Sequence, residues 1–154
     1  MEDDAPRRYL DEFVPGETFD SPQYRVTAEE AEAFARTYDP QAFHLEAAAA
    51  RASIFGRLVV SGWHTAAVTM RLVVESGVMR AIGVVGVGID ELRWTAAVEA
   101  GAVLFVHGTV LECIRRPGKS RGTLRVKLLT IDQNGTTVMS QIANLIVPQR
   151  PEPA

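Results

Sequence analysis

The feature that most constrains the fold is the segment 61–77, SGWHTAAVTMRLVVESG, which has helical start and stop signals and an almost entirely apolar surface. Ser61 suits the N-cap of a helix, and Gly77 suits the position just beyond its C-terminal end. At 1.5 Å per residue, such a helix is roughly 20 Å long. Its polar side chains are confined to threonines and a narrow stripe that contains Arg71 and Glu75, so most of its circumference must be covered by other structure. The segment therefore predicts a buried central helix.

Beyond this helix the pattern changes from helical to strand periodicity. Runs rich in β-branched residues occupy 84–94, 102–114, 121–131 and 136–147. The sequences PGKS and DQNG separate the last three runs, and the second turn carries the Asn134-Gly135 hairpin signal. This order predicts a meander of long antiparallel strands.

The first half of the chain adds a short strand and two helices. A strand is expected near 24–26, followed by a capping box of Thr27 and Glu30 that opens an amphipathic helix. Pro40 should end that helix, because it disfavours helical backbone in the residue before it. The alanine-rich segment 45–56 favours another short helix. The combined pattern predicts an α+β fold in which a curved antiparallel sheet wraps around the buried helix.

Bulk composition favours one domain over 1–154, with a core of about 9–147 and short flexible tails. The chain has 154 residues, of which 47% are hydrophobic and 23% charged, and this is typical of folded globular proteins. A formal net charge of −3, without a basic stripe, argues against nucleic acid as a partner. A lone Cys113 and three histidines give no disulfide and no zinc spacing, which favours a cytoplasmic protein without metal. No apolar run is long enough for a membrane span.

The stretch YDPQAFHLE places Asp39 five residues before His44, around a proline. A carboxylate and an imidazole that leave the same loop can both reach one water and exchange protons with it near neutral pH. The alternative is that Asp39 only helps to end a helix while His44 packs under the loop.

A second candidate feature is the start of the central helix at Ser61-Gly62-Trp63. The first amides of a helix have no intrahelical acceptor and lie at the positive end of the helix dipole. Gly62 has no side chain to block close approach, so a substrate carbonyl could be polarised there as in an oxyanion hole. The alternative is ordinary N-capping.

Other titratable residues carry weaker signals. His64 could approach a substrate or a subunit interface, although packing or capping explains it as well, and His107 fits a structural role within a strand. Arginine side chains suit phosphate groups, but a solvated turn explains their cluster equally well. The basic residues concerned are Arg57, Arg93, Arg115, Arg116, Lys119 and Arg121. Cys113 has no activating neighbour in sequence and suits a small buried apolar position.

The combination of FARTYDPQAFHLEAAAARASIFGRLVVSGWHTAAVTMRL with the later ELRWTAAVEAGAVL resembles the MaoC-like hydratase/dehydratase family of hot-dog proteins. That family has an Asp-x-Asn-Pro-x-His loop and a glycine that opens the central helix. The resemblance spans about 9–147. It implies a hot-dog fold and the (R)-specific hydration of trans-2-enoyl-CoA thioesters, or the reverse dehydration of 3-hydroxyacyl-CoA, in fatty acid metabolism.

The resemblance also implies roles for particular residues. Asp39 and His44 match the catalytic pair, and Gly62 matches the glycine whose amide binds the thioester carbonyl. Substrate contacts are expected from Gln41, Phe43, Ser61, Trp63 and His64, with Met70 also a candidate for the acyl pocket. No metal or redox cofactor is implied, because the coenzyme A thioester is itself the substrate. Two alternatives remain open, a hot-dog acyl-CoA thioesterase and a non-catalytic subunit that binds acyl thioesters.

A single hot-dog unit leaves one edge of its sheet open, and a second copy could extend the sheet and close the acyl tunnel. A homodimer is therefore expected, or a dimer of dimers.

The chain departs from the family pattern within the loop and near the helix. Gln41-Ala42 stands where the signature has Asn-Pro, and the proline has moved to Pro40. Ala67 stands where a serine is often found, Arg57 where many relatives have a second glycine, and Ala97 where proline is usual.

Overall fold

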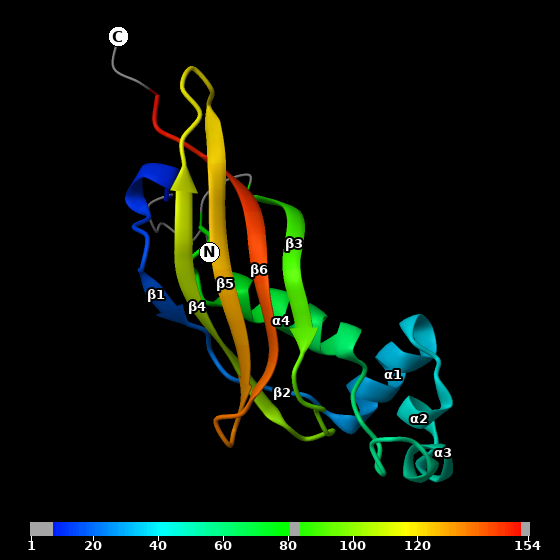
Figure 1. The fold of residues 1–154 in the computed structure, drawn as a ribbon. Helices are drawn as coiled ribbons and strands as arrows, with labels where there is room; N and C mark the ends of the chain where they lie inside the picture. The colour runs from blue at the N-terminus through cyan, green and yellow to red at the C-terminus, as the bar shows by residue number, and fades with distance from the viewer. Residues whose placement is uncertain (1–7, 81–83, 152–154) are drawn as a thin grey trace, which may run out of the picture.

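The computed structural model describes residues 8–80 and 84–151 and contains a six-stranded antiparallel sheet. The strands are β1 (Thr18–Asp20), β2 (Tyr24–Arg25), β3 (Val85–Trp94), β4 (Val103–Ile114), β5 (Arg121–Asp132) and β6 (Thr137–Pro148). Their order is β1-β4-β5-β6-β3, and β2 also pairs with β4. Figure 1 shows the long strands bending across the helix α4 (Gly62–Glu75). The four long strands and the helix agree with the sequence prediction.

Helix α4 packs its buried side chains against the inner face of the sheet. Its N-cap is Ser61, whose hydroxyl accepts a hydrogen bond from the Trp63 amide. Leu72 is fully buried, and it joins inward side chains of β4 and β5 such as Leu104 and Val126 in one core. Burial of each large aliphatic side chain contributes about 1.5–3 kcal/mol, so this contact fixes the helix on the sheet.

The predicted buried central helix is present, but the single chain buries only part of its circumference. One stripe of the helix is open, where Trp63, Met70 and Val74 are 57%, 49% and 64% exposed. The neighbouring edge strand β3, which pairs only with β6, also exposes aliphatic side chains. We call the exposed stripe of α4 and the neighbouring exposed side chains of β3 the open face, and its members are Trp63, Met70, Val74, Val87 and Ile89. The sequence showed that the helix is apolar but not which molecule covers it.

Three helices lie together beyond one end of the sheet (Figure 1). These are α1 (Ala28–Tyr38), α2 (Ala42–Leu45) and α3 (Ala47–Ala52), and a 3-10 turn η1 (Leu10–Glu12) precedes β1. The predicted capping box of Thr27 and Glu30 is present, and α1 ends at Tyr38 as expected before Pro40. The short α2 was not expected, and α3 is shorter than the predicted segment. Together, α1 and α2 place the Asp39 to His44 loop near the start of α4.

The predicted flexible tails fall mainly on 1–7 and 152–154, which lie outside the described residues. Nearer the core the prediction is wrong, because Gln149 is only 4% exposed. Its side-chain amide donates hydrogen bonds to the carbonyl groups of Arg116 and Lys119. These bonds tie the end of β6 to the turn between β4 and β5.

Candidate active site

The structure brings Asp39 and His44 into direct contact. Asp39 is the C-cap of α1, and the short α2 turns the chain so that His44 faces back toward it. Asp39 Oδ2 lies 3.1 Å from His44 Nε2, and the two side chains are 14% and 6% exposed. A loop of this shape converts a spacing of five residues into a hydrogen-bonded pair.

The contacts of His44 determine which of its two ring nitrogens can gain or lose a hydrogen. Its Nδ1 lies 2.7 Å from the Val59 carbonyl oxygen, which can only accept a hydrogen bond. Nδ1 therefore carries a hydrogen, and Nε2 is the nitrogen that gains or loses one. Because Nε2 faces Asp39, the proton-exchanging edge of the ring is directed at the carboxylate.

The carboxylate of Asp39 is held on both oxygens. Ser61 Oγ donates to Oδ2 at 2.6 Å, and Gln41 Nε2 donates to Oδ1 at 2.7 Å. Burial acts to raise the pKa of Asp39, but the hydrogen bonds from Ser61 and Gln41, together with the His44 ring, outweigh it, so this pKa lies below its ordinary value. Asp39 is therefore an ionised acceptor at neutral pH.

Ser61 lies beside the Asp39–His44 pair and is buried. It is 1% exposed and is not among the residues that line the cavity beside the pair. Its hydroxyl joins the Asp39 carboxylate to the Trp63 amide, at 2.6 and 3.3 Å. Ser61 thus links the pair to the first turn of α4.

Gly62 lies beneath the indole ring of Trp94, a residue that the sequence interpretation did not single out. Trp94 Nε1 donates to the Gly62 carbonyl oxygen at 2.8 Å. A β-carbon at Gly62 would stand 2.7 Å from the ring of Trp94, so the position requires glycine. Among the described residues no hydrogen bond is recorded for the Gly62 amide, which lies in the first turn of α4 and borders the cavity. Only the tertiary contact between β3 and α4 reveals this role of Trp94.

A cavity of about 480 Å³ lies against the pair and the start of α4. Of the predicted residues, its lining includes Asp39, Gln41, Phe43, His44, Gly62 and Trp63. The remaining wall is Phe55, Val59, Val60, Thr65, Trp94, Thr95, Ala96, Ala97 and Val98. The cavity therefore combines an apolar, partly aromatic wall with one polar corner, as expected for a site that binds an apolar chain next to a reacting group.

His64 is not among the residues that line this cavity. The ring stacks on Phe34 of α1 with 4.7 Å between centroids, and the side chain is buried. Burial lowers the pKa of His64, opposed by the nearby Glu30. Its Nδ1 has no hydrogen-bond partner among the described residues. The packing alternative therefore accounts for this histidine. Met70 is not among the residues that line this cavity in the single chain, and it belongs to the open face.

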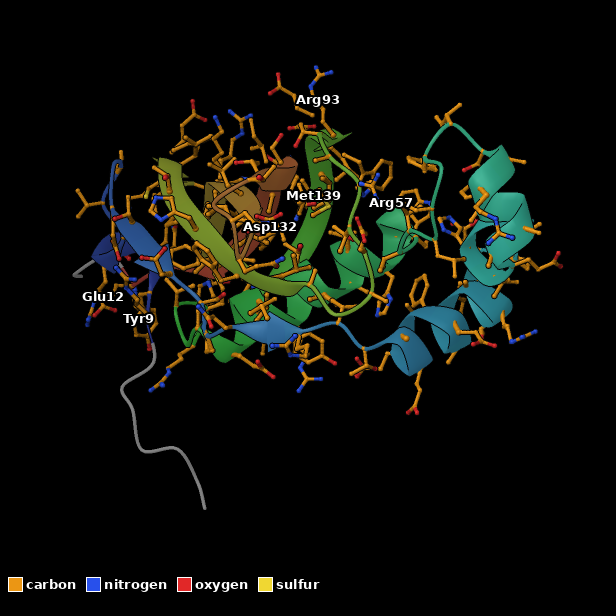
Figure 2. The ribbon with its side chains drawn as sticks, turned by 90° about the horizontal axis from the view of Figure 1, so that it is seen from below. Tyr9, Glu12, Arg57, Arg93, Asp132 and Met139 are labelled. Carbon is orange, nitrogen blue, oxygen red and sulfur yellow. The ribbon has the colours of Figure 1, made fainter. Side chains whose placement is uncertain are left out.

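The other basic candidates lie apart from the pair. Arg57 forms a 2.5 Å ion pair with Glu99 and borders a second cavity of about 450 Å³. Arg115 pairs with Asp11 near the turn between β4 and β5, at the opposite end of the sheet from α1–α3 (Figure 1). Figure 2 shows Arg93 projecting outward from β3, and Tyr9 and Glu12 far from the three helices.

Two further sequence candidates have structural contacts. His107 Nδ1 lies 2.8 Å from Asp20 across the β1–β4 pairing, and Cys113 Sγ lies 3.5 Å from the Phe13 carbonyl oxygen. Within residues 8–80 and 84–151, no cluster of three or more His, Cys, Asp or Glu side chains could hold a metal ion. No helix of the described chain is long and apolar enough to cross a bilayer.

A curved antiparallel sheet around one central helix is a hot-dog fold, and this chain carries an Asp–His pair at the first turn of that helix. Residues 12–131 match the model of the MaoC like domain, and the chain belongs to this family.

Individual relatives agree with this assignment. The crystal structure of a MaoC-like dehydratase from Rhodospirillum rubrum has a TM-score of 0.87 and 41% identity, covering 94% of this chain and 99% of that one. The R-hydratase PhaJ1 from Pseudomonas aeruginosa has a TM-score of 0.72 and 25% identity, covering 95% of this chain and 91% of the other. The uncharacterized protein YdeM of Bacillus subtilis is 26% identical over 139 residues, which are 90% of this chain and 97% of YdeM. These similarities bear out the predicted family and fold.

Proposed function

We propose that this protein catalyses the (R)-specific hydration of trans-2-enoyl-CoA thioesters, or the reverse dehydration of 3-hydroxyacyl-CoA. The observation that carries the proposal is the 3.1 Å contact between Asp39 and His44, at the polar corner of an apolar cavity bordered by Gly62. Similarity to an R-hydratase over most of the chain supports the same reaction class and its stereochemistry.

In the proposed reaction the pair holds one water above the double bond. The water oxygen adds to C3 while one of its protons passes to the pair, and the pair delivers a proton to C2, so that the elements of one water are added. Charge that develops on the thioester oxygen is stabilised by the Gly62 amide at the positive end of α4. This chemistry needs no metal or redox cofactor.

We also propose that the active form is a homodimer. The unpaired edge of β3 and the exposed aliphatic side chains of the open face favour a second copy as the cover. Trp63 belongs both to the open face and to the cavity lining, so the second copy would also close one side of the acyl site.

The test of the reaction is loss of the ultraviolet absorbance of a conjugated enoyl-CoA. Asp39→Asn and His44→Ala should each lower kcat by about 10²–10⁴-fold, the range for removal of a general acid or base. Circular dichroism of both variants should match the wild type. A wild-type protein that leaves short, long and branched enoyl-CoA unchanged would contradict the proposal, and release of free thiol would identify a thioesterase instead.

A further inference from the structure

Gln41 contacts both members of the Asp39–His44 pair. Its side-chain Nε2 donates to Asp39 Oδ1 at 2.7 Å, and its backbone amide donates to the Asp39 carbonyl oxygen at 2.8 Å. The Gln41 carbonyl oxygen accepts from the His44 amide at 3.0 Å. The sequence interpretation expected Gln41 to contact substrate, but its carboxamide nitrogen is directed at the carboxylate.

The donors around Asp39 decide where a water can bind. An ionised carboxylate has about four acceptor positions. Ser61 Oγ and His44 Nε2 both contact Oδ2, whereas Gln41 Nε2 donates to Oδ1. One acceptor position of Oδ1 therefore remains for a water, and the carboxamide of Gln41 fixes the direction in which that position points.

The side chain of Gln41 is separable from the fold of its loop. Gln41 is exposed and borders the cavity, so its side chain is not needed to fill the core. As N-cap of α2 it makes no side-chain capping bond, and the bonds that shape the loop come from its backbone. A substitution at this position can remove the carboxamide while leaving these backbone bonds in place.

We propose that Gln41 is a positioning residue, whose carboxamide orients the Asp39 carboxylate so that the free acceptor position of Oδ1 faces the water that adds to the substrate. The inference rests on the proposed hydratase function and concerns the same site. Gln41 acts through Asp39 and does not touch the reacting atoms.

The electrostatic surroundings of Asp39 allow a pH readout. From α2 the titratable group that faces it is His44, from α4 it meets the neutral Ser61 hydroxyl, and β3 brings the uncharged Trp94 indole to the same cavity. The bond from Gln41 is one cause of the lowered pKa of Asp39. Its removal should raise that pKa, and therefore shift the acid limb of kcat/KM to higher pH.

The kinetic test compares Gln41→Ala, Gln41→Glu and Gln41→Asn. Loss of a hydrogen bond to a charged group should lower kcat of the Ala variant about 10-fold or more, with KM nearly unchanged. The Glu variant, which places a second carboxylate beside Asp39, should shift the acid limb further, and the Asn variant, which keeps the carboxamide, should recover part of kcat. Glu46→Ala truncates a side chain of similar size just after α2, and should behave as wild type.

A second measurement does not depend on turnover. Nuclear magnetic resonance titration of the ¹³C-labelled Asp39 carboxyl should give a pKa below its ordinary value in the wild type and a higher one in Gln41→Ala. If the wild type lacks hydratase activity but this shift occurs, the proposed function fails while the contact of Gln41 with Asp39 stands. An unchanged Asp39 pKa, or a raised KM with unchanged kcat, would overturn the positioning role.

Discussion

Ser61 joins two parts of the site through a single buried hydroxyl. Its hydroxyl donates to the Asp39 carboxylate and accepts from the Trp63 amide. The same oxygen atom therefore stabilises the charge of Asp39 and caps the first turn of α4. Because the folded-state pKa of Asp39 is lowered, the ionised carboxylate stabilises the fold above about pH 4, and this contribution is lost as the pH falls through the folded-state pKa.

We expect Ser61→Ala to lower the free energy of unfolding by about 1–2 kcal/mol at pH 7, the usual range for loss of an N-cap. The destabilisation should shrink as the pH falls through the lowered folded-state pKa of Asp39, because the carboxylate that accepts from Ser61 is then lost. Urea denaturation at pH 7 and pH 3 measures the difference. Ser76→Ala, at the other end of α4 and away from Asp39, should show a destabilisation that is independent of pH.

His64 gives the stability of the fold a second pH dependence, which comes from a base that is buried in its neutral form. Burial lowers its folded-state pKa, so the unfolded state binds a proton more readily, and stability should fall as the pH drops below about 6.5. His64→Phe, which keeps a ring against Phe34, should flatten the melting temperature between pH 7 and pH 5. An unchanged slope in His64→Phe would contradict this account.

At the scale of elements, α4 and β5 meet through a buried pair of hydroxyl groups. Thr69 Oγ1 and Thr130 Oγ1 are 2.6 Å apart, and Thr69 also donates to the Thr65 carbonyl oxygen at 2.8 Å. The single hydroxyl hydrogen of Thr69 is thus used within the helix, and Thr130 must be the donor between the two elements.

The direction of this hydrogen bond, from Thr130 to Thr69, predicts that two similar substitutions lower the free energy of unfolding by unequal amounts. Thr69→Val removes the acceptor of a buried hydroxyl and should cost about 1–3 kcal/mol, whereas Thr130→Val leaves Thr69 its bond to Thr65 and should cost less. The double variant should be less destabilised than the sum, because no buried donor is left without an acceptor. Thermal denaturation of the three variants measures the coupling, and equal single effects would argue against the assigned direction.

Local patterns in the sequence predicted the elements better than their contacts. The capping signals of Ser61 and Thr27 and the alternation of the long strands depend on neighbours in the chain, and the corresponding elements are present. The closeness of Asp39 and His44 could be predicted because both residues belong to one short loop. By contrast, the packing of His64 against α1 and the contact of Trp94 with Gly62 join segments that are distant in the sequence. Sequence spacing therefore did not reveal them.

At the scale of the whole molecule, the open face leads to a prediction about assembly. We expect the wild type to be dimeric in size-exclusion chromatography with light scattering. Val74→Lys on α4 and Val87→Lys on β3 should each shift it toward monomer, because an unpaired charge is costly to bury in an apolar contact. Val14→Lys alters an aliphatic side chain that is 62% exposed and outside the open face, and should remain dimeric. A monomeric wild type at micromolar concentration would contradict the proposed dimer.

The placement of the tryptophans has a practical consequence for the whole chain. The sequence contains 2 tryptophans, Trp63 and Trp94, whose rings meet edge to face with 5.0 Å between centroids. Both border the cavity beside the Asp39–His44 pair. Tryptophan emission from this protein therefore originates entirely at the candidate site, and the unlabelled wild type carries its own optical probe of ligand binding there.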